Sequence, residues 1–197
     1  MKKNRKEHLK FLKSLGLKGV EKAKESAKTL GHFEVRNGII LSDPCYKKDT
    51  WCALEIPKDR VKQGVWEASV CYKDKRCSKL MAFHENFVPR NIKSADWKPQ
   101  NDELGVDSGQ LGIYDSEFYN DCSVAKHYKF IDEEHKNLGD NGLWYGMNCD
   151  ITLSDVMAGI LPYGCVSSSG YGDGAYLADY LIDNKKIVGI RITFIEG

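Results

Sequence analysis

The sequence predicts a mainly β (α+β) protein, either an antiparallel β-sandwich or a partly open barrel, with an N-terminal helical extension. Short segments of alternating polar and apolar residues recur from residue 32 onward, and turn sequences rich in Gly, Asn, Asp and Lys separate them. The 197 residues are enough for one sizeable core. We therefore expect a basic helical extension over residues 1–31 and one β-rich domain over residues 32–197.

The N-terminal segment is basic. Residues 1–30 hold ten basic and three acidic side chains, a net charge of +7, whereas the whole chain carries only +1. Leu9, Leu12 and Leu15 recur at helical spacing, and Gly31 suits the end of a helix. We expect two short amphipathic helices that are separable from the β domain. Because the whole chain is nearly neutral, nucleic acid is an expected partner only for this basic segment.

Four turn sequences predict tight connections between strands. Asn-Gly supplies the positive φ angles of a type I′ hairpin turn, and short charged turns join alternating segments elsewhere. These turns lie at residues 37–38, 73–76, 107–110 and 183–186. We also expect one helical turn over residues 154–159, and surface loops without regular structure over residues 89–103 and 132–141.

Cysteine usage and hydropathy favour a cytoplasmic protein. The seven cysteines are an odd number, scattered without a dense disulfide framework, so we expect free thiols. Early lysines and glutamates interrupt any secretory signal, and no apolar run reaches the roughly 18–20 residues of a membrane span. We therefore expect no membrane partner. The cysteine spacings also do not match compact zinc sites. His84, His127 and His135 are candidate bases for a thiolate at Cys45 or Cys165, but nothing local in the sequence ties any such pair together.

Three loops carry the candidate site. In Ser-Asp-Pro-Cys-Tyr (residues 42–46) the proline holds the aspartate in extended backbone at a strand end. In Gly-Val-Asp-Ser-Gly-Gln (105–110) the glycines allow close backbone approach beside polar side chains. In the segment from 167 to 176, alternate glycines and three serines could form an anion-holding nest of N–H groups. The candidate binding residues are Asp43, Asp107, Ser108, Gln110, Ser168, Ser169, Tyr171 and Asp173.

These three motifs resemble an uncharacterised family found in bacteria and phages, domain of unknown function 4241. The similarity runs from about Phe33 to Phe194, and its most specific part is Ser-Gly-Tyr-Gly-Asp-Gly-Ala-Tyr at residues 169–176. The resemblance implies that Asp43, Asp107 and Asp173 lie on recurring motifs of that family. It supplies no catalytic residue.

Three functions remain open from the sequence. The leading hypothesis is a non-enzymatic binding module, by analogy a phage- or defence-related regulator, whose loops recognise a small anionic ligand or a protein partner. The alternative is a metal-dependent phosphoester hydrolase in which Asp43, Asp107 and Asp173 hold a divalent cation. In the third, the loops serve folding or oligomer formation only. The sequence fixes neither the identity of the ligand nor the oligomeric state.

Overall fold

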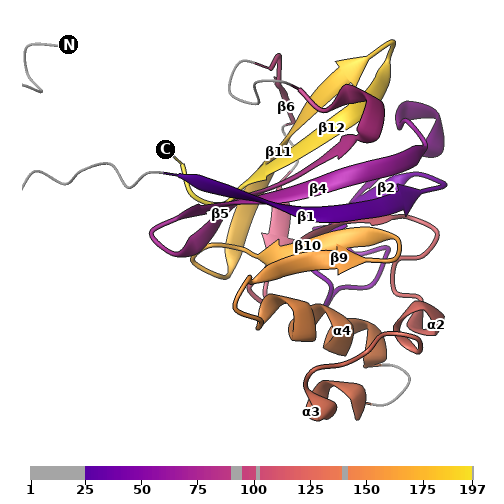
Figure 1. The fold of residues 1–197 in the computed structure, drawn as a ribbon. Helices are drawn as coiled ribbons and strands as arrows, with labels where there is room; N and C mark the ends of the chain where they lie inside the picture. The colour runs from indigo at the N-terminus through magenta and orange to yellow at the C-terminus, as the bar shows by residue number, and fades with distance from the viewer. Residues whose placement is uncertain (1–24, 90–94, 101–102, 139–141, 197) are drawn as a thin grey trace, which may run out of the picture.

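Two antiparallel sheets and a layer of short helices make up the protein (Figure 1). The computed structural model describes residues 25–89, 95–100, 103–138 and 142–196. The larger sheet contains, in spatial order, β1 (Ser26–Val35), β4 (Gly64–Lys73), β5 (Arg76–His84), β12 (Lys186–Thr193), β11 (Gly174–Asp183) and β6 (Lys98–Pro99), with β7 (Leu104–Val106) paired to the start of β11. The smaller sheet contains β3 (Leu54–Ile56), β2 (Ile39–Ser42), β8 (Gln110–Asp115), β10 (Gly164–Ser168) and β9 (Ala158–Leu161).

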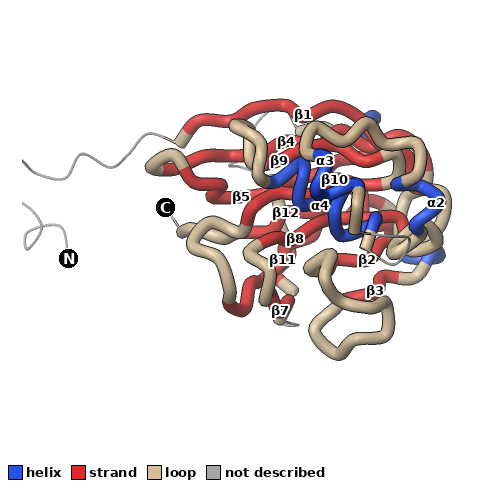
Figure 2. The backbone as a smooth tube through the Cα atoms, turned by 90° about the horizontal axis from the view of Figure 1, so that it is seen from below, coloured by secondary structure: helices blue, strands red, loops and turns tan. Residues whose placement is uncertain are grey.

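The smaller sheet is the middle layer, because both of its faces are buried. Side chains alternate along a strand, so Ile39 and Leu41 pack against the larger sheet while Ile40 belongs to the opposite core. That second core lies against α4 (Leu143–Thr152), which runs across the outer face of the smaller sheet (Figures 1 and 2). Trp144 and Met147 of α4 are buried there. The predicted mainly β, antiparallel sandwich is therefore confirmed, and the two sheets do not close into a barrel.

Two of the predicted hairpins form as expected. Strands β4 and β5 are joined through Asp74 and Lys75, with φ angles of 50° and 65°. Strands β11 and β12 are joined through Asn184 and Lys185, with φ angles of 45° and 67°. Positive φ at both central residues is what a two-residue hairpin turn of type I′ requires.

The Asn37-Gly38 hairpin prediction is wrong, because the strands on either side belong to different sheets. Strand β1 pairs with β4, whereas β2 pairs with β3 and β8. The buried carboxylate of Asp115 accepts hydrogen bonds from the backbone N–H groups of Arg36 (2.6 Å) and Asn37 (2.8 Å). A Cβ at Gly38 would lie 2.3 Å from the Ile56 carbonyl oxygen, so the chain needs glycine for this crossing rather than for a turn.

The turn predicted at residues 107–110 also connects two sheets instead of closing a hairpin. Strand β7, before it, pairs with β11 of the larger sheet. Strand β8, after it, pairs with β2 and β10 of the smaller sheet. The loop therefore spans the edge of the sandwich, where both sheets are within reach.

The helical extension is wrong where the structure describes it. Residues 26–31, expected to end a helix at Gly31, form part of β1, and Ser26 pairs with Tyr72 of β4. The register shifts between Thr29 and Gly31, whose φ of 135° suits a bulge. The exposed edge of β4 offers backbone partners to this segment, and pairing outweighs its helical composition. The rest of the predicted extension, residues 1–24, lies outside the described residues.

The other helices depart from the sequence prediction. Helix α4 was not expected, and its weak helix formers explain why, since Trp, Tyr, Gly, Asn and Thr are among its ten residues. Packing on the smaller sheet stabilises it instead. Helix α3 (Glu133–Lys136) lies in a predicted surface loop. In place of the helical turn predicted at 154–159, residues 154–157 form a single turn closed by the Met157 N–H and the Ser154 carbonyl (2.9 Å), and β9 begins at Ala158.

Helix α2 (Cys122–Ala125) and the 3-10 turns η1 (Lys58–Arg60) and η2 (Glu85–Phe87) complete the described helices. None of the helices in the described part of the chain is long and apolar enough to cross a membrane.

We predict that Asp115→Ala lowers the free energy of unfolding by about 3 kcal/mol, because it removes a buried carboxylate that accepts hydrogen bonds from several backbone N–H groups and leaves a cavity in its place. Asp115 also accepts from the Glu117 N–H (2.8 Å). Urea denaturation measures the change. Asp96→Ala, at an exposed position, is the control and should change stability by less than about 0.5 kcal/mol. A loss below about 1 kcal/mol for Asp115→Ala would show that the crossing does not depend on this carboxylate.

Candidate functional site

The three loops identified in the sequence meet at one edge of the sandwich. The first loop reaches the second through the Asp43 carboxylate, which binds the backbone of residues 107 and 108. The second reaches the third where the Ser169 N–H donates to the Gly109 carbonyl at 2.9 Å. A Cβ on Gly109 would lie only 3.8 Å from the Gly172 Cα. Segments more than 60 residues apart in sequence are therefore neighbours at this edge.

Asp43 holds the second loop in place. Its side chain is fully buried, and its carboxylate accepts four hydrogen bonds. Oδ2 accepts from the N–H groups of Asp107 (2.9 Å) and Ser108 (2.7 Å). Oδ1 accepts from the Ser108 hydroxyl (2.5 Å) and from the Cys45 N–H (2.9 Å). We call these four bonds the Asp43 clasp. Bonds to a charged acceptor are the strong ones, so the clasp offsets the cost of burying the carboxylate.

The local sequence brings the carboxylate to this position. Strand β2 ends at Ser42, and the Cys45 bond to Asp43 closes an Asx turn immediately after the strand. The Tyr119 hydroxyl lies 2.9 Å from Ser42 Oγ and from the carbonyl oxygens of Asp43 and Tyr46. The Tyr119 hydroxyl therefore holds the end of β2 in addition to the clasp.

A pocket of about 180 Å³ opens between the second loop and α4. We call it the small pocket. Its walls contain three of the predicted site residues, and α4 supplies the remaining side. The lining residues are Ser108, Gly109, Gln110 and Ser168, with Tyr145, Cys149, Thr152 and Leu153 on the helical side.

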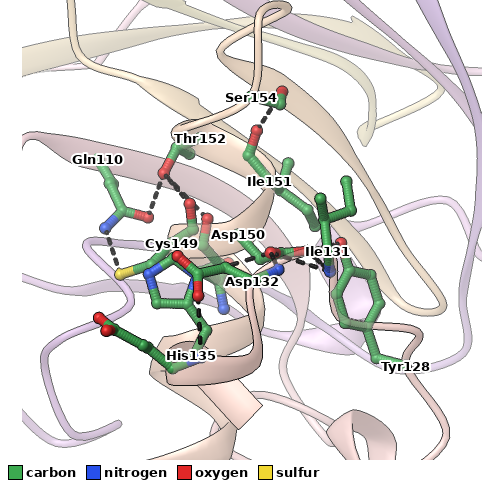
Figure 3. Close-up of polar contacts among 12 residues, drawn as sticks. Gln110, Tyr128, Ile131, Asp132, His135, Cys149, Asp150, Ile151, Thr152 and Ser154 are labelled. Atoms are coloured by element: carbon green, nitrogen blue, oxygen red, sulfur yellow. Dashed lines mark hydrogen bonds and ion pairs between the residues drawn. The ribbon is translucent and has the colours of Figure 1, made fainter.

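Gln110 is the polar side chain at the inner wall of the small pocket. It is only 6% exposed. Its Oε1 accepts from the Thr152 hydroxyl at 3.0 Å, and its Nε2 lies 3.4 Å from the Cys149 sulfur (Figure 3). Both partners are on α4, so the helix fixes the orientation of the carboxamide.

A second pocket of about 690 Å³ adjoins the small one, and Tyr145 lines both. We call this the large pocket, and the two together the groove. Residues 44–47 form one wall, and Asn120, Cys122 and Trp144 line other parts. Desolvation raises the pKa of the Tyr145 hydroxyl to about 12, with contributions from Cys149 and the Asp43 charge. The phenol is therefore protonated at neutral pH.

The groove lacks the usual groups of acid–base and nucleophilic catalysis. No histidine, aspartate or glutamate is among the described residues that line it, and Lys47 is the one charged side chain. Desolvation and the neighbouring Asp43 raise the pKa of the Cys45 thiol to about 12, so it is not a thiolate at neutral pH. All seven cysteines of the chain are free thiols.

Asp150 anchors α4 on the side facing away from Gln110 (Figure 3). Its carboxylate accepts hydrogen bonds from the Tyr128 hydroxyl (2.9 Å) and from the N–H groups of Ile131 (3.0 Å) and Asp132 (2.8 Å). His135 Nδ1 lies 3.6 Å from it. Burial opposes ionisation, but these contacts outweigh it and lower the pKa of Asp150. The carboxylate thus ties the segment before α3 to the helix that lines the groove.

The predicted site residues separate into two groups. Ser108, Gln110 and Ser168 line the small pocket, and Asp43 holds its wall. Four others do not line the groove: Asp107, which enters the clasp through its N–H while its side chain is exposed, and Ser169, Tyr171 and Asp173.

Polar groups of residues 169–176 in the third loop bind one another. The Ser169 hydroxyl donates to the Gly172 carbonyl (2.8 Å), and the Gly172 N–H donates back to the Ser169 carbonyl (3.3 Å). The Tyr176 hydroxyl binds both of these carbonyl oxygens. Tyr171 is exposed and lies under the Arg76 guanidinium at 5.2 Å. The anion-holding nest predicted here is therefore wrong for the Gly172 N–H, which points back into the loop.

The structure does not support a shared cation site of Asp43, Asp107 and Asp173. Among the described residues, which include all three, no group of three or more His, Cys, Asp or Glu side chains is placed to hold a metal ion. The oxygens of Asp43 are already taken by the clasp. The metal-dependent hydrolase therefore loses its proposed ligands.

Sequence reasoning missed the helical half of the groove. Tyr145, Cys149 and Thr152 follow at intervals of four and three residues, which places them on one face of α4. That spacing is the signal that could have identified them, but only once a helix is assigned to this segment.

Searches against protein-family models, curated proteins and solved structures found no match for this chain. The resemblance to domain of unknown function 4241 stays a prediction.

We predict that Asp150→Asn destabilises the protein at pH 7 and that the difference from wild type shrinks in acid. The folded-state pKa of Asp150 lies below its ordinary value, so its contribution is present above about pH 4 and is lost as pH falls through the folded-state pKa. Thermal unfolding from pH 7 to pH 3 measures this, with the exposed Asp155→Asn as control. A difference that is constant across this range would contradict the role of the charged carboxylate.

Proposed function

We propose that this protein is a non-enzymatic binding module that holds a small polar ligand in the groove between the Asp43-braced loop and α4. The observation that carries the proposal is the small pocket, in which side chains from the two motif loops face a helix that fixes Gln110. Sites for small molecules are typically preformed concavities with a few fixed polar groups. The groove has this character, since the clasp and Thr152 hold its polar walls.

Binding is favoured over catalysis by the composition of the walls. General acid–base catalysis needs a titratable group close to the reacting atoms, and the described lining residues offer a lysine, thiols and the phenols of Tyr46 and Tyr145. The thiol of Cys45 and the phenol of Tyr145 both have pKa values raised to about 12. Neither is suited to proton transfer or nucleophilic attack near pH 7.

The two pockets favour different parts of one ligand. The small pocket is lined by uncharged side chains, so it suits a neutral hydrogen-bonding group. The large pocket contains Lys47, which gives an anionic group on the same ligand a partner there. A ligand long enough to extend past Tyr145 would occupy both pockets.

The proposal predicts that a small molecule stabilises the wild-type protein but not a variant with a filled pocket. A panel of amino acids, nucleosides, nucleotides and sugars is screened by thermal shift, and positive compounds are measured by calorimetry. Ligand binding to the native state raises the melting temperature in proportion to RT ln(1 + [L]/Kd). Ser168→Met should abolish that shift by filling the small pocket. Ser69→Met, on the outer face of β4, should leave it unchanged.

Three outcomes would contradict the proposal. A stabilising compound that acts equally on Ser168→Met would place its site elsewhere. Chemical conversion of a panel compound, abolished by Ser168→Met, would make the groove an active site. If no compound in the panel binds, the small-ligand function fails and the protein-partner hypothesis gains weight.

A further inference from the structure

The hydrogen-bonding capacity of Gln110 is only half used. A glutamine carboxamide carries two N–H donors and two acceptor lone pairs. Among the described residues, Thr152 occupies one lone pair and the Cys149 sulfur faces one donor. One N–H and one lone pair therefore remain at the wall of the small pocket. Exchanging the amide oxygen and nitrogen leaves the same remainder, because each partner can then take the opposite role.

From the unused N–H and lone pair of Gln110 we infer that the small pocket recognises an uncharged amide edge, in which a C=O and an N–H lie side by side. A ligand with such an edge can accept from the remaining Gln110 N–H and donate to the remaining lone pair of its oxygen. Primary carboxamides, uracil and thymine carry this edge. The inference rests on the proposed binding function and names the class of ligand for the same groove.

The surrounding charge disfavours a carboxylate in this position. Every side chain that lines the small pocket is uncharged, and Tyr145 keeps its proton at neutral pH. The buried Asp43 carboxylate lies directly behind Ser108, whose hydroxyl donates to it. An anionic ligand would lose hydration, meet no cation and approach this negative charge. A carboxylate also lacks the N–H that the Gln110 oxygen requires.

The size of the small pocket fits a single ring. An apolar cavity of roughly 150 Å³ is large enough for benzene. The small pocket, at about 180 Å³, therefore has room for a six-membered ring with its amide edge. Gly109, which also lines the pocket, has a φ of 70°. Residues with side chains rarely adopt this backbone conformation, so this part of the wall favours glycine. A substituent on the ring would extend past Tyr145 into the large pocket.

The experiment compares two pairs of probes that differ in the amide or in charge. Nicotinamide is matched with nicotinate, and uracil with orotate, which adds a carboxylate to the same base. Saturation-transfer NMR and calorimetry at pH 7 measure binding to the full chain. We expect nicotinamide, uracil or both to bind, and the acid of each binding pair to bind at least tenfold more weakly. Preference for uracil would indicate a base as the natural ligand, and preference for nicotinamide a primary carboxamide.

Variants of the Gln110 side chain complete the test. Gln110→Met keeps a similar length without the amide, and it should weaken binding at least tenfold while Ser69→Ala does not. If Gln110→Met unfolds, Thr152→Val replaces it, because losing the hydroxyl frees the carboxamide and should weaken binding severalfold.

Equal binding of amide and acid, undiminished binding to the folded variant, or binding of none of the four probes would overturn the inference. A panel compound of another class that loses binding in Ser168→Met would still uphold the proposed function.

Discussion

A buried carboxylate without a cationic partner among the described residues is the constraint on which this site depends. Asp43 is fully buried, and a charge in that position is tolerated only where hydrogen bonds replace its hydration. The four donors come from the turn after β2 and from the loop between β7 and β8. Satisfying one side chain therefore fixes the backbone that carries Ser108 and leads directly into Gln110. The negative charge of Asp43 also acts on neighbouring groups, because it contributes to the raised pKa values of Cys45 and Tyr145.

The groove forms where α4 and the loop between β7 and β8 are each held in place at the edge of the smaller sheet. The smaller sheet has no solvent-facing side, so α4 must cover it, and the polar residues of α4 meet the loop only at the edge. Asp150 fastens the helix from its other side through the N–H groups of Ile131 and Asp132. Two buried carboxylates thus position the two walls, one for the loop and one for the helix. This arrangement places fixed hydrogen-bonding groups at the groove, which is the physical basis for the proposed binding function.

The features that the sequence predicted correctly are those decided by nearby residues. The hairpins through Asp74 and Asn184 depend on local φ preferences and alternating side chains. The Asn37-Gly38 crossing could not be predicted in this way, because its N–H groups bind Asp115, 78 residues further along the chain. For the site, the motifs identified Asp43, Ser108, Gln110 and Ser168, but not that Asp43 would hold the wall of the small pocket instead of lining it. Tyr145 and Thr152 were missed because packing, rather than intrinsic propensity, makes their segment helical.

Amide hydrogen exchange in Asp43→Asn tests the role of the clasp most directly. Asparagine retains the Asx turn but replaces one acceptor of the carboxylate with a donor, so the N–H groups of Asp107 and Ser108 lose their charged partner. We predict that both amides are strongly protected in the wild-type protein and exchange at least tenfold faster in the variant. Amides across β5 and β12, in the distant part of the larger sheet, should keep their wild-type rates. Unchanged protection at Asp107 and Ser108 in a folded Asp43→Asn protein would show that the loop holds its shape without the carboxylate, contradicting the central claim.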